Sequence, residues 1–199
     1  MRVVLFGMKH CGKTTLGRRL AGLWDCPFYD IDTLIEDAFR SEECRSMTVR
    51  EILGRYGENG FAAREEAAVI DLARRLEEQD AADLRAGASP GHYVVALGGR
   101  TPLNPKLRPV LTRMGLNVFL DIGAEEAWRR VQRSGIPSFL TGPDPRAEFF
   151  ALYRDRRPHY RSQADLTLQL SGLDQGQALE RLVAALEERG HAREGGHAR

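Results

Sequence analysis

The sequence predicts a single α/β domain in which a parallel β-sheet is covered by helices on both faces. Three observations support this fold class. Apolar runs of strand length alternate along the chain with segments whose apolar residues have helical spacing. The first apolar run leads through a glycine-containing turn into such a helical segment. The length of 199 residues suits one domain with a substantial core and is too short for two domains of ordinary size.

The composition argues against several classes of function. The 29 Lys and Arg residues nearly balance the 28 Asp and Glu residues, so we expect no general attraction to nucleic acid or to an anionic membrane. The three cysteines lack the paired spacing of a zinc site, which favours a reducing, cytoplasmic location. The apolar runs are too short to span a bilayer. Any anion-binding site must therefore be local, and we take a monomer as the default.

The elements can be assigned in order along the chain. A buried strand is predicted over Val3–Phe6, and it is followed by the spacing Gly7-x-x-x-x-Gly12-Lys13-Thr14 at the start of a helix. Thr48 with Glu51 three residues later is a capping-box pattern and predicts the start of another helix, to about Tyr56. The tail 190–199 repeats Gly-His-Ala-Arg and is predicted to be disordered. The further predicted strands are Phe28–Ile31, Tyr93–Leu97, Asn117–Asp121 and Asp165–Leu170, and the further predicted helices are Phe61–Leu84, Lys106–Arg113, Glu125–Gln132, Arg146–Arg156 and Gln175–Glu188.

The stretch after the first strand matches the phosphate-binding loop of nucleotide-binding proteins. In such a loop the backbone N–H groups face a polyphosphate, the lysine contacts the β- and γ-phosphates, and the threonine hydroxyl is available to Mg²⁺. The sequence therefore predicts ATP and Mg²⁺ as ligands and Lys13 as a catalytic residue. An Asn-Lys-x-Asp guanine signature is absent, which argues against a GTPase. The predicted nucleotide-binding residues of the loop are Gly7, His10, Cys11, Gly12, Lys13, Thr14 and Thr15.

Three features near the ends of predicted strands suggest an acceptor site beside this loop. Asp30 and Asp32 end the second strand, and one carboxylate can hold Mg²⁺ while the other accepts a proton from a substrate hydroxyl. Asp32 equally fits the N-cap of a helix. Gly98 and Gly99 follow the third strand, where bare backbone either lets a ligand approach closely or forms a plain tight turn. Arg156 suits a substrate carboxylate, with a solvated surface charge as the alternative.

Further motifs accompany these features, namely Phe61-x-x-x-Glu65, Leu97-Gly98-Gly99, Gly142-Pro143-Asp144 and Arg156-x-Pro158-x-Tyr160-x-x-x-Ala164-Asp165. With the phosphate loop and Asp30-x-Asp32, their order and spacing resemble the shikimate kinase family over about residues 1–189. The resemblance implies a single P-loop kinase domain over 1–189. The implied fold is a P-loop NTPase three-layer sandwich, whose five-stranded parallel sheet has the strand order 2-3-1-4-5. It also implies transfer of the ATP γ-phosphate to the 3-hydroxyl of shikimate.

The same resemblance implies roles for individual residues. Asp32 would hydrogen-bond the acceptor hydroxyls as a catalytic residue, and Arg156 would pair with the shikimate carboxylate. Glu65 would orient a substrate-binding arginine. The implied substrate-binding residues also include Gly98 and Gly99, the implied metal-binding residues are Thr14 and Asp30, and Arg133 would lie against the adenine.

The sequence departs from the family pattern in the acceptor pocket and the lid. Ala62 stands where the family has an arginine that grips the shikimate carboxylate, and Arg100 replaces the third glycine of a Gly-Gly-Gly turn. The lid between Arg133 and Arg146 has no basic residue for the γ-phosphate. We hypothesise that Arg100 binds substrate from the space above Ala62, and that Arg146 or a neighbour serves the lid.

Two alternatives stay open. A related P-loop kinase that acts on a different hydroxylated acid or polyol would also explain an altered acceptor pocket. A non-catalytic ATP-binding regulator is the second alternative. Against it, a decayed kinase would have no need of Lys13, Thr14, Asp30 and Asp32 together, and all four are in place.

Overall fold

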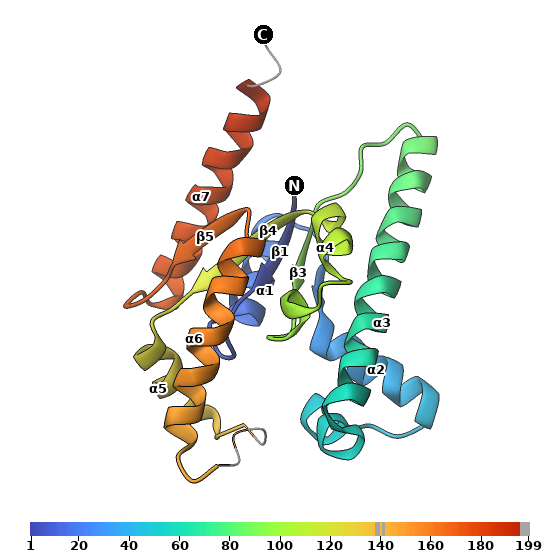
Figure 1. Cartoon of the computed structure of the whole chain (residues 1–199). Coiled ribbons are helices and arrows are strands. Elements are labelled where there is room, and N and C mark those ends of the chain that lie inside the picture. The colour runs from blue at the N-terminus through green and yellow to red at the C-terminus, as the bar shows by residue number, and fades with distance from the viewer. Residues whose placement is uncertain (138–139, 141, 196–199) are drawn as a thin grey trace.

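A computed structural model of the chain describes residues 1–137, 140 and 142–195. Its centre is a five-stranded sheet in the order β2-β3-β1-β4-β5, in which every neighbouring pair of strands is parallel (Figure 1). The predicted fold class and strand order are therefore confirmed. The strands are β1 (Arg2–Phe6), β2 (Phe28–Asp30), β3 (Tyr93–Ala96), β4 (Leu116–Asp121) and β5 (Leu166–Gln169).

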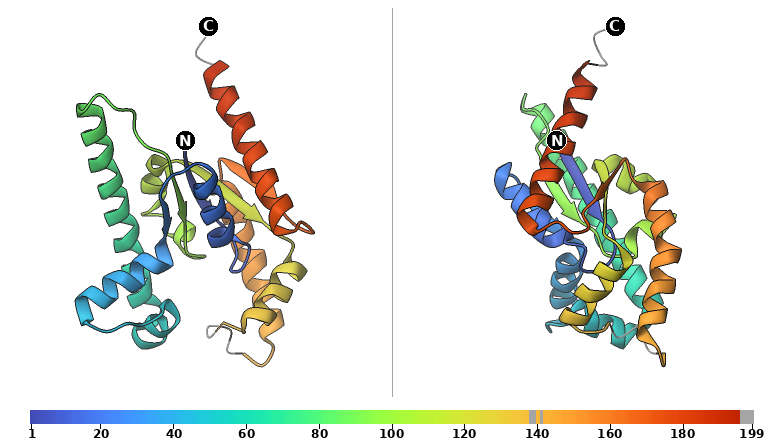
Figure 2. Two further views of the ribbon diagram at one scale, coloured as in Figure 1. Left: turned by 180° about the vertical axis from the view of Figure 1, so that it is seen from behind. Right: turned by 90° about the vertical axis from the view of Figure 1, so that its left-hand side faces the viewer.

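Helices cover both faces of this sheet. Helices α1 and α7 pack together on one face, and α4 and α6 lie on the other (Figures 1 and 2). Helix α2 packs against α3 on the β2 side, and α5 packs against α6. Within the described residues, no helix combines the length and the apolar character needed to cross a membrane. The helices are α1 (Lys13–Leu23), α2 (Ile31–Glu43), α3 (Val49–Arg85), the 3₁₀ helix η1 (Thr101–Leu103), α4 (Arg108–Met114), α5 (Ala124–Ser134), α6 (Pro145–Gln163) and α7 (Gln175–Gly195).

The central strands form the hydrophobic core because they are apolar on both faces. Every residue of β3 and β4 is buried, and so is Val3–Phe6 of β1. Continuous apolar runs of this kind are expected for parallel strands that lie between two layers of helices. The edge strands β2 and β5 are less buried.

Helix α3 carries the predicted capping box and a bend. The Thr48 hydroxyl accepts a hydrogen bond from the Glu51 backbone N–H at 3.3 Å, and the Glu51 carboxylate accepts one from the Thr48 backbone N–H at 2.7 Å. The bend lies at Gly57, whose φ of 68° and ψ of −178° are accessible essentially only to glycine. The helical segment predicted to about Tyr56 and the one predicted from Phe61 therefore meet at a break at Gly57, within the range assigned to α3.

Three local predictions need correction. The short helix η1 was not predicted, and α6 continues to Gln163 instead of ending at Arg156. Helix α7 runs past residue 189 to Gly195, so the predicted disorder of 190–199 does not hold for residues 190–195. Composition indicated disorder, but Ala, Arg and Glu in this stretch are good helix formers that extend the preceding turns. Residues 196–199 lie outside the described residues.

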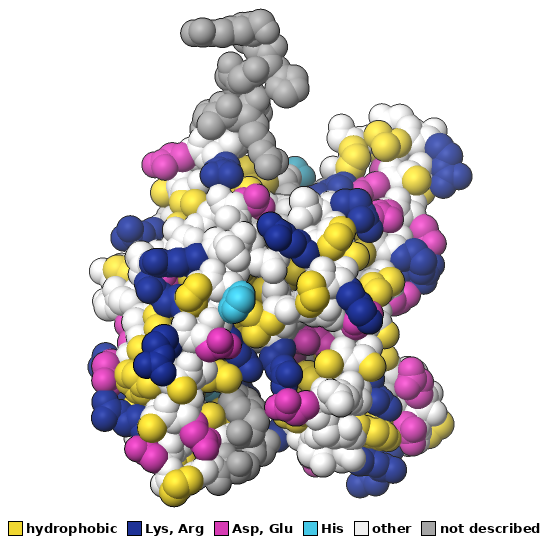
Figure 3. All heavy atoms as spheres, viewed as in Figure 1, with side chains coloured by type: hydrophobic (Ala, Val, Ile, Leu, Met, Phe, Trp, Pro, Cys, Tyr) yellow, Lys and Arg dark blue, Asp and Glu magenta, His cyan; other side chains and the backbone are white. Residues whose placement is uncertain are grey.

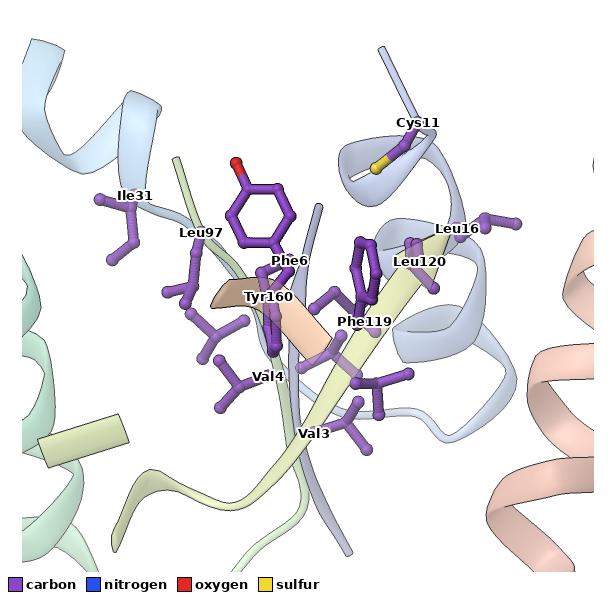
Figure 4. Close-up of a cluster of buried hydrophobic side chains, with 14 of the residues drawn as sticks. Val3, Val4, Phe6, Cys11, Leu16, Ile31, Leu97, Phe119, Leu120 and Tyr160 are labelled. Carbon is purple, nitrogen blue, oxygen red and sulfur yellow. The ribbon is translucent and has the colours of Figure 1, made fainter. Parts of the chain in front are cut away.

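An aromatic cluster fixes α6 to the end of the sheet (Figure 4). Phe6 stacks on Phe119 with a centroid distance of 5.9 Å, and the Tyr160 ring lies 6.0 Å from Phe6 and 5.3 Å from Phe119. Burial raises the pKa of Tyr160 to about 12, and its hydroxyl donates a hydrogen bond to the Gly99 carbonyl. The cluster therefore joins β1, β4, α6 and the turn after β3 near the carboxyl ends of the strands.

Candidate active site

The phosphate loop joins β1 to α1, as predicted. Gly7 has φ 149° and Gly12 has φ 107°, conformations that favour glycine. A Cβ on Gly7 would lie 2.6 Å from the Leu120 carbonyl oxygen, so the loop passes close to the end of β4. The Lys13 ammonium donates hydrogen bonds to the carbonyl oxygens of Gly7 and Met8, both at 3.1 Å. These partners are neutral, so they hold the lysine over the loop without cancelling its charge.

Helix α5 supports this loop from the side. Arg130 donates a hydrogen bond to the His10 carbonyl at 3.2 Å and pairs with Glu126 at 2.5 Å. His10 has φ 62°, an uncommon conformation for a residue with a side chain. Burial, followed by the charges of Lys9 and Lys13, lowers the pKa of the His10 imidazole. The shift favours the neutral form of the ring.

Asp30 connects the phosphate loop to α2. Its Oδ1 accepts a hydrogen bond from the Asp32 backbone N–H at 3.1 Å, which makes Asp30 the N-cap of α2. Its Oδ2 accepts a hydrogen bond from the Thr14 hydroxyl at 2.7 Å. The alternative interpretation of Asp32 as the N-cap is wrong, because Asp32 lies in the first turn of the helix.

Asp32 lies between the phosphate loop and the turn after β3. A Cβ on Gly98 would lie 3.4 Å from Asp32 Oδ1. Burial, and then the neighbouring charge of Asp30, raises the pKa of Asp32, while Lys13 and Lys9 partly offset this. A carboxylate with a raised pKa at this position can accept a proton from an acceptor hydroxyl.

Glu65 of α3 packs beneath the turn after β3. It is 4% exposed and accepts a hydrogen bond from the Thr101 hydroxyl at 2.6 Å. Burial raises the pKa of Glu65, whereas the Thr101 hydrogen bond and the charges of Arg100 and Arg156 lower it. A Cβ on Gly98 would lie 2.2 Å from Glu65 Oε1, so a glycine is required for this close approach.

Arg100 lies over the face of α3 that carries Ala62. Its guanidinium pairs with Glu58 at 2.9 Å, and Glu58 precedes Ala62 by one helical turn. The side chains of Arg100 and Glu58 are 43% and 62% exposed. Exposed pairs of this kind contribute about 0.2–1 kcal/mol, so the guanidinium can readily take another anionic partner. That Arg100 occupies the space above Ala62 stays a hypothesis.

Arg156 reaches the same turn from α6. A Cβ on Gly99 would lie 3.8 Å from Arg156 Nη1. Helix α6 is anchored by Asp121, a carboxylate at the end of β4 that is 1% exposed. Asp121 pairs with Arg157 at 2.8 Å and with Arg161 at 3.3 Å. Because Arg157 is the next residue in the helix, this network sets the direction in which Arg156 extends.

A cavity of about 680 Å³ lies beside the phosphate loop and reaches Asp32. Its wall also includes the end of α5 and the start of α7. The surface is notched between the side of the molecule that holds α6 and the side that holds α3, with basic and acidic side chains near the notch (Figure 3). All predicted nucleotide-binding residues except Gly7 line the cavity, namely His10, Cys11, Gly12, Lys13, Thr14, Thr15 and Arg133.

Arg146, expected to serve the lid, has contacts elsewhere. It pairs with Glu125 at 2.7 Å, and its guanidinium lies 5.1 Å from the centroid of the Phe150 ring. It is not part of the cavity wall. In this arrangement Arg146 does not face the cavity, and the hypothesis that Arg146 or a neighbour serves the lid stays a prediction. Residues 138, 139 and 141 of the lid lie outside the described residues.

The donor groups beside the loop fit Mg²⁺. Within the described residues, no group of three or more His, Cys, Asp or Glu side chains could hold a metal ion by itself. Thr14 and Asp30 instead present two oxygen atoms 2.7 Å apart at the end of the phosphate loop. Mg²⁺ in kinases is held by one or two such groups together with water and substrate phosphates.

Four residues of this site were missed in the sequence. Local spacing could have identified Lys9, which lies inside the phosphate-loop motif, and Glu58, which lies one helical turn before Ala62. It could not have identified Thr101 or Arg130. Thr101 contacts a residue 36 positions away and Arg130 one 120 positions away, which local spacing does not reveal.

Comparisons with known proteins agree with this geometry. A family model described as shikimate kinase matches residues 9–187. The shikimate kinase of Rhodococcus jostii is 30% identical over 94% of this chain and 98% of its own length, and that of Ruegeria pomeroyi is 35% identical over 94% and 85%. A structure of shikimate kinase from Acinetobacter baumannii in complex with shikimate superposes with a TM-score of 0.73 at 26% identity, covering 94% of this chain and 93% of the other. Since the match extends over almost the whole chain, from the phosphate loop to α7, the chain belongs to the shikimate kinase family.

Proposed function

We propose that this protein is an ATP-dependent kinase that transfers the γ-phosphate of ATP to the 3-hydroxyl of shikimate. The observation that carries the proposal is one cavity whose wall includes Lys13, Thr14 and Asp32. A phosphate and an acceptor hydroxyl can meet there. Family membership supports ATP as the phosphoryl donor, and the shikimate-bound relative supports shikimate as the acceptor.

The reaction can be assigned to the residues of this cavity. The acceptor oxygen forms a bond to the γ-phosphorus, and the bond from the γ-phosphorus to the bridging oxygen breaks. That oxygen keeps the electron pair and leaves as part of ADP. Asp32 takes the proton of the hydroxyl, and Lys13 stabilises the charge on the phosphates. Thr14 and Asp30 would hold Mg²⁺, which when bound neutralises charge on the β- and γ-phosphates.

Two arginines support binding of the acceptor carboxylate. Arg156 lies next to Gly99, and Arg100 pairs with the exposed Glu58, one helical turn before Ala62. A guanidinium can hold a carboxylate through two parallel hydrogen bonds, and its remaining donors can keep a second partner. We propose that Arg100 and Arg156 together replace the grip of the arginine that is absent at position 62, and that Gly98 and Gly99 contribute backbone contacts.

A second candidate is phosphorylation of a different hydroxylated acid or polyol. Relative to the family pattern, Ala62 replaces an arginine and Arg100 replaces a glycine. This difference favours the second candidate, because it changes the position of the cation that would select the acceptor. Arg133, on the wall of the nucleotide cavity, is proposed to contact the adenine in either case. The monomeric state and the cytoplasmic location stay predictions.

A coupled assay of ADP release tests these candidates directly. Purified protein with ATP and Mg²⁺ is given shikimate, or one member of a panel of polyols and hydroxy acids, and the product is identified by ³¹P NMR. We expect ADP release that depends on shikimate and a product phosphorylated on the 3-hydroxyl. A faster reaction with another acceptor would favour the second candidate. ATP binding without turnover of any acceptor would contradict both and favour a regulator.

A further inference from the structure

In the described part of the site, no basic residue of the lid faces the negative charge that develops on the γ-phosphoryl group. Phosphoryl transfer spreads negative charge over the oxygens of the γ-phosphoryl group, and kinases place several cations around it. Here Arg146 is paired with Glu125 outside the cavity, and Arg130 is paired with Glu126 and supports the loop. The other basic residues on the cavity wall are Lys9, Lys13 and Arg133, and Arg133 is proposed to contact the adenine, so Lys9 and Lys13 are left to face the phosphates.

Lys9 is in the right place. It lies within the phosphate loop, and it lines the same cavity as Lys13 and Asp32. The charges of both residues act on its ammonium. The sequence has only three lysines, and two of them are in this loop.

The surroundings of Lys9 suit a bound anion. Lys9 is exposed as a residue, yet partial desolvation of its ammonium lowers its pKa, and so do the positive charges of Arg50 and Lys13, while Asp32 opposes the shift. Lys9 makes no hydrogen bond to another described residue, and it has no ion pair with one within 4.0 Å. Several cations gathered around one cavity repel one another, and a phosphoryl group with its negative oxygens relieves that repulsion.

We propose that Lys9 is a further catalytic residue, whose ammonium donates hydrogen bonds to the oxygens of the γ-phosphoryl group during transfer and so replaces the cation that the lid lacks. The inference rests on the proposed function. The lysine keeps its proton throughout: the hydroxyl proton goes to Asp32, and the electron pair of the broken bond leaves on ADP. Its contribution is stabilisation of charge that develops in the transition state, so it affects kcat more than substrate binding.

Three variants test this role in the coupled assay, with the acceptor that the wild-type protein turns over. Lys9→Met is expected to lower kcat about 100-fold, within the range for removal of one charge-stabilising donor. The KM for the acceptor is expected to stay within about threefold, because ground-state binding is little changed. Lys9→Arg should recover most of kcat, and Lys106→Met is the matched control, since Lys106 pairs with Glu66 away from the cavity. Wild-type kcat in Lys9→Met would overturn the proposal.

A second measurement needs neither a variant nor an acceptor. Trace acetylation of the wild-type protein, read by tandem mass spectrometry, reports the reactivity of each of the three lysines. With ADP, Mg²⁺ and aluminium fluoride as a mimic of the transferred group, we expect Lys9 and Lys13 to be protected and Lys106 to react as before. Protection of Lys13 with unchanged labelling of Lys9 would contradict the role of Lys9, even if the protein proves to be an active kinase. Protection of Lys9 in a protein that does not phosphorylate shikimate would refute only the proposed acceptor.

Discussion

On the phosphate side of the site, the groups that would contact the ligand come almost entirely from one stretch of chain, residues 7–15. On the acceptor side they come from α2, α3, the turn after β3 and α6. The phosphate side is largely backbone shaped by glycines, and its geometry fails if the spacing changes. The acceptor side is a set of charged side chains from separate elements. A charge there can move from one element to another, as we propose for position 62 and Arg100, and still reach the same space.

The largest effect is expected on the phosphate side, from Lys13→Met. Loss of this ammonium removes a charge that the loop holds over the bound phosphates, so we expect kcat to fall by about three orders of magnitude. The coupled ADP-release assay measures this, with Lys106→Met as the control for loss of a lysine. A fall of less than tenfold would mean that the loop does not face the transferred phosphate.

A smaller effect, and of a different kind, is expected on the acceptor side from Arg156→Met. A charge-assisted hydrogen bond is worth about 1.5–3 kcal/mol, so the KM for shikimate should rise about 10- to 100-fold with little change in kcat. Arg154→Met, at an exposed position of the same helix, is the control. If kcat fell and KM stayed the same, Arg156 would act on the reaction and not on binding.

The smallest effect concerns stability, through the carboxyl of Glu65 beneath the acceptor side. Burial raises its pKa in the folded protein above the ordinary value of 4.5, so its contribution to stability is present below that pH and is lost as pH rises through the folded pKa. Glu65→Gln has no proton to lose. The free energy of unfolding of Glu65→Gln minus that of the wild type should therefore increase as pH rises above about 4.5.

Urea unfolding at a series of pH values from 4.5 to 8 measures this gain, with both proteins in the same buffers. A difference between variant and wild type that does not depend on pH would show that Glu65 titrates as it does in the unfolded chain. That result would remove the buried carboxyl as a distinguishing feature of the acceptor side.

The same comparison explains what could be predicted from the sequence. The loop glycines, Lys13 and Thr14 were assigned because a local motif fixes their geometry, and the sheet was assigned because its strands are continuous apolar runs. The partner of Arg100 and the contacts of Arg146 could not be assigned, because each depends on which element packs beside a long, flexible side chain. The length of α7 was missed because composition outweighed helix propensity in the interpretation of residues 190–195.

The central claim is that Arg100 has taken over from position 62 as a grip on the substrate carboxylate. The most direct measurement is the KM for shikimate of Arg100→Ala, beside Arg113→Ala, which breaks a similarly exposed pair with Glu77 at 3.2 Å. We expect KM to rise about tenfold or more in Arg100→Ala, to stay unchanged in Arg113→Ala, and to recover when Ala62→Arg is added to Arg100→Ala. An unaltered KM in Arg100→Ala would contradict the claim.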